Sequence, residues 1–162
     1  MKTSPTGKRV QNNVFLMERT RTYLFFMLCL FPAILTAQSV VDVITYAGQN
    51  DLSDPYHGSG ILQRCSGVLM GYAKYLPSDM QKQKQVFAEK AQKTMVRAGV
   101  ILHEAKQISD EASLEQITSA FIFYTEHYFA KIERTQLATG SIFSGEVADE
   151  LMFCSEIVRR HK

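Results

Sequence analysis

The side chains best suited to chemistry in this sequence are its cysteines and histidines, but their spacing does not match a common redox or haem site. Cys65 and Cys154 both lack the second cysteine of a Cys-x-x-Cys pair, and no Cys-x-x-Cys-His motif occurs. The sequence therefore predicts neither a dithiol redox centre nor covalently attached haem. Non-covalent haem would need only facing histidine or methionine side chains, and His103 and His127 leave that alternative open.

The same histidines also lack the spacing of metal ligands. His103-Glu104 begins like the His-Glu-x-x-His helix of zinc proteases, but Gln107 stands where the second histidine is required. Helical di-metal proteins need a glutamate three residues before the histidine, and Val100 and Tyr124 occupy those positions. We therefore expect no metal and no other cofactor.

Motifs built on a nucleophile or a phosphate loop are absent as well. The sequence contains no Gly-x-Ser-x-Gly elbow, no Ser-x-x-Lys pair and no glycine-rich phosphate loop. The segment His57-Gly58-Ser59-Gly60 resembles a fragment of a catalytic loop, but a turn and an N-cap for the first helix explain every residue in it. Two acidic pairs, Asp110/Glu111 and Asp149/Glu150, fall at or near expected helix starts, where the helix dipole favours acids. The sequence therefore predicts a protein that is not an enzyme.

One segment is more apolar than a helix in a small bundle requires. Residues 121–129 read Phe-Ile-Phe-Tyr-Thr-Glu-His-Tyr-Phe, which is aromatic or aliphatic almost all round. A helix that is apolar on every face is either central in its domain or covered by a partner. The segment therefore predicts an interaction surface, either for an unknown protein partner or second copy or as a hydrophobic ligand groove. The alternative is a widened core face covered by residues 38–58. The residues expected on the surface are Ile122, Phe123, His127 and Phe129.

The elements that must position these residues are helices. Apolar residues recur at three- and four-residue steps over four segments, at about 59–76, 78–108, 113–137 and 144–160. Pro77 ends the first segment, Ser78-Asp79 begins the second, and caps near Ser113 and at Ser144 begin the third and fourth. The fold class expected is all-α: an up-down four-helix bundle over residues 59–162, preceded by a short irregular leader over residues 38–58.

Two features of the first helix concern its neighbours. Gly67 and Gly71 lie one turn apart and would let another backbone approach, and we expect this to be the second helix near Ala98-Gly99. In an up-down bundle the first and last helices are adjacent, so Cys65 and Cys154 on their inner stripes can form a disulfide. The alternative is two separate buried thiols.

The N-terminal segment predicts export. Residues 23–35 carry no charge, Arg19 and Arg21 stand before them, and the small residues of Thr36-Ala37-Gln38-Ser39 follow. This is the three-part pattern of a signal peptide over residues 1–37, with cleavage after Ala37 or, second, after Ser39. The apolar run is too short to cross a bilayer, so no membrane span is expected after cleavage. Met17 is a more ordinary start for such a signal, which would make residues 1–16 an over-extended gene start.

Removal of this segment changes the charge of the protein and its cysteine count. Residues 1–37 hold five of the 18 basic residues and one of the 16 acidic ones, so the formal charge changes from +2 to −2. That balance argues against a nucleic-acid partner, and the three cysteines become a pair. The sequence predicts a periplasmic or secreted bacterial protein that acts by non-catalytic binding or assembly. The alternative is a carrier of a small apolar ligand or non-covalent haem within the bundle.

Overall fold

The computed structural model describes residues 40–107 and 109–160, and the signal peptide and its cleavage sites lie outside these residues. Within them the secondary structure is helical throughout, which confirms the all-α fold class. No helix in the described ranges is both long and apolar enough to span a membrane. The elements are α2 (Val43–Gln49), α3 (Pro55–Tyr75), the 3-10 turn η1 (Ser78–Met80), α4 (Gln81–Lys106), α5 (Asp110–Thr139) and α6 (Gly145–Arg160).

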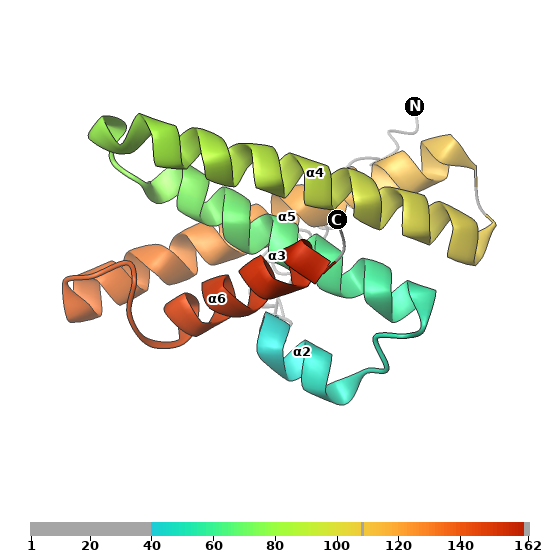
Figure 1. Cartoon of the computed structure of the whole chain (residues 1–162), viewed down its shortest axis with the longest axis horizontal. Coiled ribbons are helices and arrows are strands. Elements are labelled where there is room, and N and C mark those ends of the chain that lie inside the picture. Colours follow the sequence, from blue (N-terminus) through green and yellow to red (C-terminus); the bar gives the residue numbers. More distant parts are fainter. Residues whose placement is uncertain (1–39, 108, 161–162) are drawn as a thin grey trace, which may run out of the picture. The chain divides into compact units, whose positions relative to one another are not determined.

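Helix α3 is the central element of the bundle. It packs against α4, α5 and α6 as well as against the short helix α2, and Figure 1 shows α4 and α6 running along different sides of it. Its side chains are accordingly buried around most of its circumference, which is the pattern of a helix enclosed by others. The buried side chains of α3 include Ile61, Leu62, Cys65, Val68, Leu69 and Tyr72.

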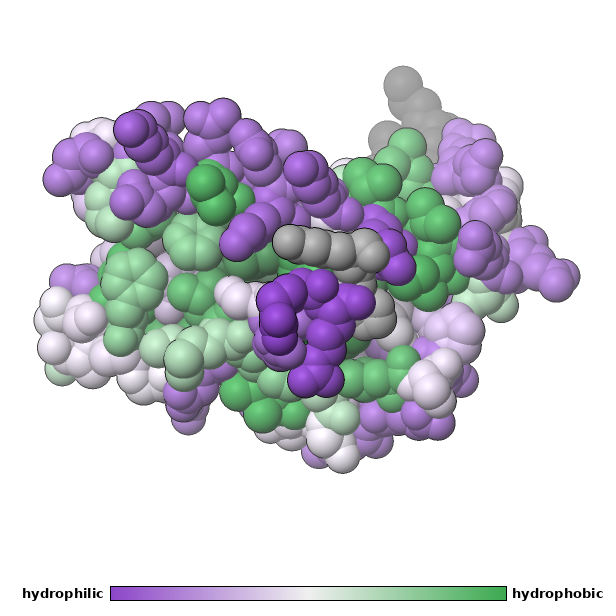
Figure 2. Space-filling view, in the orientation of Figure 1, coloured by the Kyte–Doolittle hydropathy of each residue, from purple (hydrophilic) through white to green (hydrophobic). Residues whose placement is uncertain are grey.

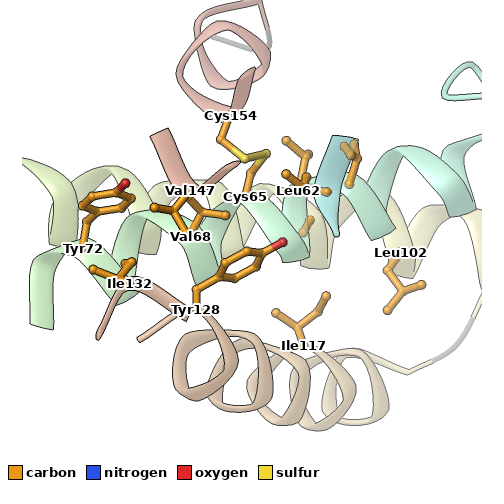
Figure 3. Packing of buried hydrophobic residues seen from close by; sticks show 13 residues of the cluster. Leu62, Cys65, Val68, Tyr72, Leu102, Ile117, Tyr128, Ile132, Val147 and Cys154 are labelled. Atoms are coloured by element: carbon orange, nitrogen blue, oxygen red, sulfur yellow. A yellow bond between two sulfur atoms is a disulfide. The ribbon is translucent and has the colours of Figure 1, made fainter. Parts of the chain in front are cut away.

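The predicted disulfide is confirmed and joins α3 to α6. The Cα atoms of Cys65 and Cys154 are 5.1 Å apart, both residues are fully buried, and Figure 3 shows the bridge beside Val68 and Val147. The two cysteines are 89 residues apart in the sequence. Closing a loop of this length in the unfolded chain costs entropy, and the stabilisation expected from that effect is about 4–5 kcal/mol.

The close approach at Gly67 and Gly71 involves α5, so the prediction that α4 lies there was wrong. A Cβ at Gly67 would overlap the Cβ of Tyr124, and one at Gly71 would lie 3.0 Å from the Cβ of Tyr128. A Cβ at Gly99, on α4, would meet only the Cγ1 atom of Ile117, at 3.6 Å. The spacing of small residues along one helix shows that a backbone approaches but does not identify which one.

The leader is more ordered than the irregular segment predicted for it. The Asp42 carboxylate accepts a hydrogen bond from the Thr45 amide (2.8 Å) and caps α2, and Val43 is fully buried in the core cluster. Helix α3 also begins four residues earlier than predicted, because Asp54 caps it by accepting from the Tyr56 amide at 2.7 Å. The leader therefore contributes to the core instead of only lying on it.

The His57–Gly60 segment lies inside α3 and is not the turn and N-cap that its sequence predicted. The Ser59 hydroxyl donates a hydrogen bond to the Ala98 carbonyl at 2.8 Å and so links α3 to α4. Gly60 makes room for the Tyr46 ring, whose Cζ would be 3.0 Å from an added Cβ. At the start of α5 the N-cap is Ser109, four residues before the predicted Ser113.

Candidate functional site

The predicted interaction surface lies on α5, and two of its four residues are well exposed. Ile122 and Phe123 have exposed fractions of 58% and 52%, whereas Thr125, Tyr128 and Ile132 of the same helix are buried in the bundle. The helix is therefore held rigidly by its inner face while it presents large apolar side chains to solvent. We call the exposed side of α5 around Ile122 and Phe123 the α5 outer face.

The other two predicted residues, His127 and Phe129, are only half-buried and lie at the edges of this face. The ring centroid of Phe129 is 5.5 Å from that of Tyr75, and the Lys74 ammonium lies 5.3 Å from the Phe129 centroid. The His127 ring packs edge-on against Tyr128. Burial, together with nearby cations, holds the pKa of His127 below its ordinary value, so its imidazole is uncharged at neutral pH. Phe129 thus serves mainly packing.

Helix α2 does not cover the exposed part of α5. It packs on α3 and α6, and its Tyr46 ring lies 3.7 Å from the Arg64 guanidinium, which in turn lies 4.9 Å from the Tyr124 ring. The alternative of a core face covered by the leader thus accounts for Tyr124. Within the described part of the leader, nothing covers Ile122 or Phe123.

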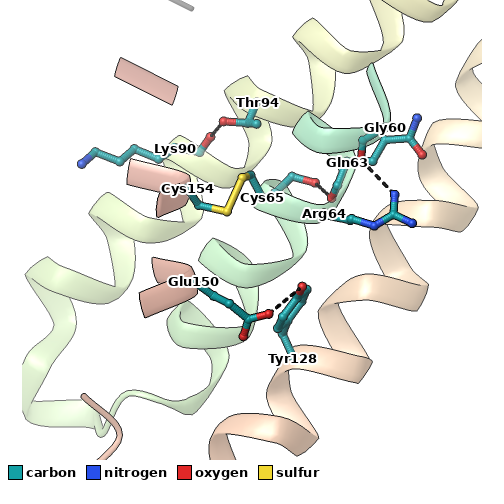
Figure 4. The surroundings of a disulfide bond; sticks show 10 residues. Gly60, Gln63, Arg64, Cys65, Lys90, Thr94, Tyr128, Glu150 and Cys154 are labelled. Atoms are coloured by element: carbon teal, nitrogen blue, oxygen red, sulfur yellow. Dashed lines mark hydrogen bonds between the residues drawn. A yellow bond between two sulfur atoms is a disulfide. The ribbon is translucent and has the colours of Figure 1, made fainter. Parts of the chain in front are cut away.

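A buried polar cluster joins α5 and α6 and was not predicted. Glu150 is 1% exposed, its carboxylate accepts a hydrogen bond from the Tyr128 hydroxyl at 3.3 Å (Figure 4), and the Lys131 ammonium lies 3.0 Å from its other oxygen. The same ammonium lies 3.2 Å from the exposed Glu146 carboxylate. The ammonium thus pairs with the buried charge, but the carboxylate oxygen that it faces accepts no well-aligned hydrogen bond, so the cost of burying that charge is only partly offset.

The electrostatics of this cluster follow from its burial. Burial raises the pKa of Glu150, and the Lys131 ammonium only partly offsets that effect. Burial alone would lower the pKa of Lys131, but its contacts with Glu150 and Glu146 outweigh it and leave the pKa raised. Burial and the neighbouring carboxylate also raise the pKa of Tyr128. At physiological pH the Tyr128 hydroxyl is therefore neutral and the Lys131 side chain is charged.

The interpretation of Asp149/Glu150 as acids of a helix start was wrong for both residues. Helix α6 begins at Gly145 and the acid of its first turn is Glu146, so Asp149 and Glu150 lie beyond it, where the helix dipole has little effect. Asp149 is exposed, while Glu150 faces the core. The other pair, Asp110/Glu111, does lie in the first turn of α5, as predicted.

The histidines in the described residues lie apart from one another and make ordinary contacts. The Nδ1 atom of His57 is 3.2 Å from the Tyr46 hydroxyl, and that of His103 is 3.2 Å from the Asp110 carboxylate. Among residues 40–107 and 109–160, no group of three or more side chains of the metal-ligating types is close enough to hold an ion.

Comparison with known proteins adds no functional assignment. The chain matches no protein-family model, no curated protein and no solved structure.

Proposed function

We propose that this protein is exported to the bacterial periplasm or exterior and acts there by self-association through the α5 outer face. The observation that carries the proposal is the exposure of Ile122 and Phe123 on a helix whose inner face is fixed in the core. When a partner surface removes these two large apolar side chains from water, their burial stabilises the complex.

Export is supported by two features at different places in the chain. The N-terminal sequence has the basic, apolar and small-residue regions of a signal peptide. The Cys65–Cys154 disulfide suits an oxidising compartment, because cytosolic reductants keep most thiols reduced.

The charges on α5 favour a second copy of the same chain as the partner. An antiparallel pairing of two α5 helices, centred between Tyr124 and Thr125, places Glu115 of one copy beside Arg134 of the other. Both side chains are exposed, and neither forms an ion pair within the described residues. A two-fold axis produces this pair twice, about 14 Å on each side of the centre.

Side chains near that axis are compatible with close packing. Ser119 of one copy lies opposite Ala130 of the other in the same pairing, and both side chains are small enough for two helices to approach. His127 lies near the centre, and its uncharged ring can be buried at a low desolvation cost. One helix face per copy is a small interface, so we expect a reversible, concentration-dependent dimer.

The test is the oligomeric state of the purified protein over a range of concentrations, measured by sedimentation velocity. We expect Phe123→Glu to weaken the dimer at least about tenfold, because a charge would be buried without a partner. Met152→Glu is the matched control, because Met152 is 65% exposed on α6 and lies outside α5. A strictly monomeric protein, or equal dimerisation of the Phe123→Glu variant, would contradict self-association through this face.

A further inference from the structure

A groove runs between α4 and α6 on a part of the molecule that the α5 outer face does not include. Its volume is about 780 Å3, and α4 supplies most of its wall. The apolar side chains that line it come from three helices: Leu62 of α3, Val86, Val96, Val100 and Ile101 of α4, and Val158 of α6. Figure 2 shows apolar surface beside the hydrophilic side chains of α4.

The groove forms because α4 and α6 pack on the same helix, α3, but differ in length. Helices α4 and α6 both pack on α3, and α6 is a short helix of 16 residues that leaves part of α4 without a neighbour. Val96 and Val100 are 62% and 52% exposed as a result. Valine has a low helix propensity, so two exposed valines on one side of α4 indicate a surface that binds an apolar group.

The rim of the groove is basic. Lys90, Lys93 and Arg97 recur at three- and four-residue steps along α4, so they lie on the same side as the exposed valines. None of the three forms an ion pair within the described residues. A smaller hollow of about 270 Å3 shares Lys90 and Val158 with the groove and adds Arg159, which is paired with Glu156.

Two acids also line the groove but leave the basic stripe intact. The Glu89 carboxylate accepts a hydrogen bond from Gln85 at 3.0 Å. Glu104 lies seven residues beyond Arg97, about 10 Å along the helix. Between residues 89 and 97, α4 therefore gives the groove three cations, Lys90, Lys93 and Arg97, and one acid, Glu89.

We infer that this groove binds a single-chain anionic amphiphile, with its alkyl chain along Val96, Val100 and Ile101 and its carboxylate or phosphate head at Lys90, Lys93 and Arg97. The groove volume lies in the range of small-molecule sites, which are mainly apolar with a few placed polar groups. None of the described residues that line it is a histidine, cysteine or methionine, the usual axial ligands of haem iron. This inference uses different helices from the proposed dimer and does not depend on it.

The binding experiment uses three probes with the same alkyl chain: dodecanoate, dodecyl phosphate and dodecyltrimethylammonium. Each is titrated into the purified full chain below its micelle concentration, by calorimetry and native mass spectrometry. We expect one bound molecule per chain for at least one anionic probe and at least about tenfold weaker binding of the cationic probe. Preference between the two anions distinguishes a fatty-acid head group from a phosphate.

Variants then locate the site. We expect Val100→Glu to weaken binding at least about tenfold, because it places an acid in the apolar channel beside the alkyl chain. Lys93→Gln combined with Arg97→Gln should weaken binding of the anionic probe to a similar degree and should strengthen binding of the cationic probe, because two like charges are removed. Phe123→Glu, on the α5 outer face, is the matched control and should bind normally.

Three results would overturn the inference. The first is no binding of either anionic probe, and the second is equal binding of the anionic and cationic probes. The third is unchanged binding by the Val100→Glu variant with the disulfide intact. Saturable binding of an acidic amphipathic peptide without binding of either alkyl anion would assign the groove to a protein partner and also refute the proposal.

Discussion

The Lys131 ammonium lies 3.0 Å from the carboxylate of Glu150, and this ion pair joins α5 to α6 in the interior of the bundle. On α6, Glu150 lies one helical turn before Cys154, whose disulfide joins α6 to α3 (Figure 4), so one covalent and one electrostatic link hold the last helix. The two links differ in their response to conditions, because a disulfide depends on redox state and an ion pair on protonation.

Loss of Lys131 should destabilise the protein much more than loss of an exposed lysine. Lys131→Met leaves the Glu150 charge buried without its cation, which costs about 3 kcal/mol in the free energy of unfolding at neutral pH. Lys74→Met removes the ion pair with exposed Glu126 and should cost less than about 1 kcal/mol. Urea unfolding of the two variants and the wild type measures both values. Equal stability of the two variants would show that the buried pair is dispensable.

Glu150 should make stability depend on pH in the sense opposite to that of ordinary carboxylates. Burial raises its pKa in the folded state, so the folded chain binds a proton more readily than the unfolded one. Between the ordinary value of 4.5 and the raised value, the contribution of this group to stability therefore increases as the pH falls.

Glu150→Gln isolates this effect, because glutamine does not titrate. We expect the free energy of unfolding of the wild type, measured relative to this variant, to increase as the pH falls from the raised pKa of Glu150 toward its ordinary value of 4.5. Glu156→Gln is the control with the opposite sign, because the Arg160 and Arg159 side chains lower the pKa of Glu156. If the difference in the free energy of unfolding between the wild type and Glu150→Gln does not change with pH, burial does not destabilise the charged carboxylate of Glu150.

The helices and the disulfide could be predicted because they depend on periodicity within one segment. Cys65 lies four residues after Ile61 and three before Val68, and all three are fully buried on α3. The same spacing placed Cys154 on the inner stripe of α6, so adjacency of the two helices was enough to pair the cysteines.

The buried cluster was missed because its partners come from different helices. In the sequence alone, Glu150 resembles a glutamate exposed to solvent. Nothing in its own segment identifies Lys131, on another helix, as its partner. One signal was available: Glu150 lies three residues after Val147 and four before Cys154, which places it on the inner stripe of α6. The contact partner of Gly67 was missed for a related reason, since spacing within α3 does not specify the neighbouring helix.

Gly67 and Gly48 should respond in opposite ways to alanine. Gly67→Ala forces α3 away from α5, because the new Cβ would overlap Tyr124, and the expected cost is about 1–3 kcal/mol. Gly48 lies in α2 with no atom within 4 Å of an added Cβ, so Gly48→Ala should be neutral or stabilise by up to about 1 kcal/mol. Thermal and urea unfolding measure both effects. Tolerance of alanine at Gly67 would mean that α3 and α5 pack less closely.

The antiparallel dimer can be tested by exchanging charges on α5. Glu115→Arg places two like charges together at each end of the pairing, and Arg134→Glu does the same with the opposite sign, so each single variant should weaken the dimer. The double variant restores the attraction between the copies and should recover most of the wild-type affinity. Because both positions are exposed, the monomer fold should be unaffected.

The pattern of recovery separates this geometry from other forms of association. A parallel pairing of the helices brings Glu115 next to Glu115 and Arg134 next to Arg134, so the double variant would only exchange one repulsion for the other. Sedimentation velocity of the four proteins at matched concentration distinguishes the cases. The antiparallel arrangement requires coupling between positions 115 and 134. If the double variant weakens the dimer by the sum of the two single effects, that arrangement is refuted, even if Phe123→Glu abolishes the dimer.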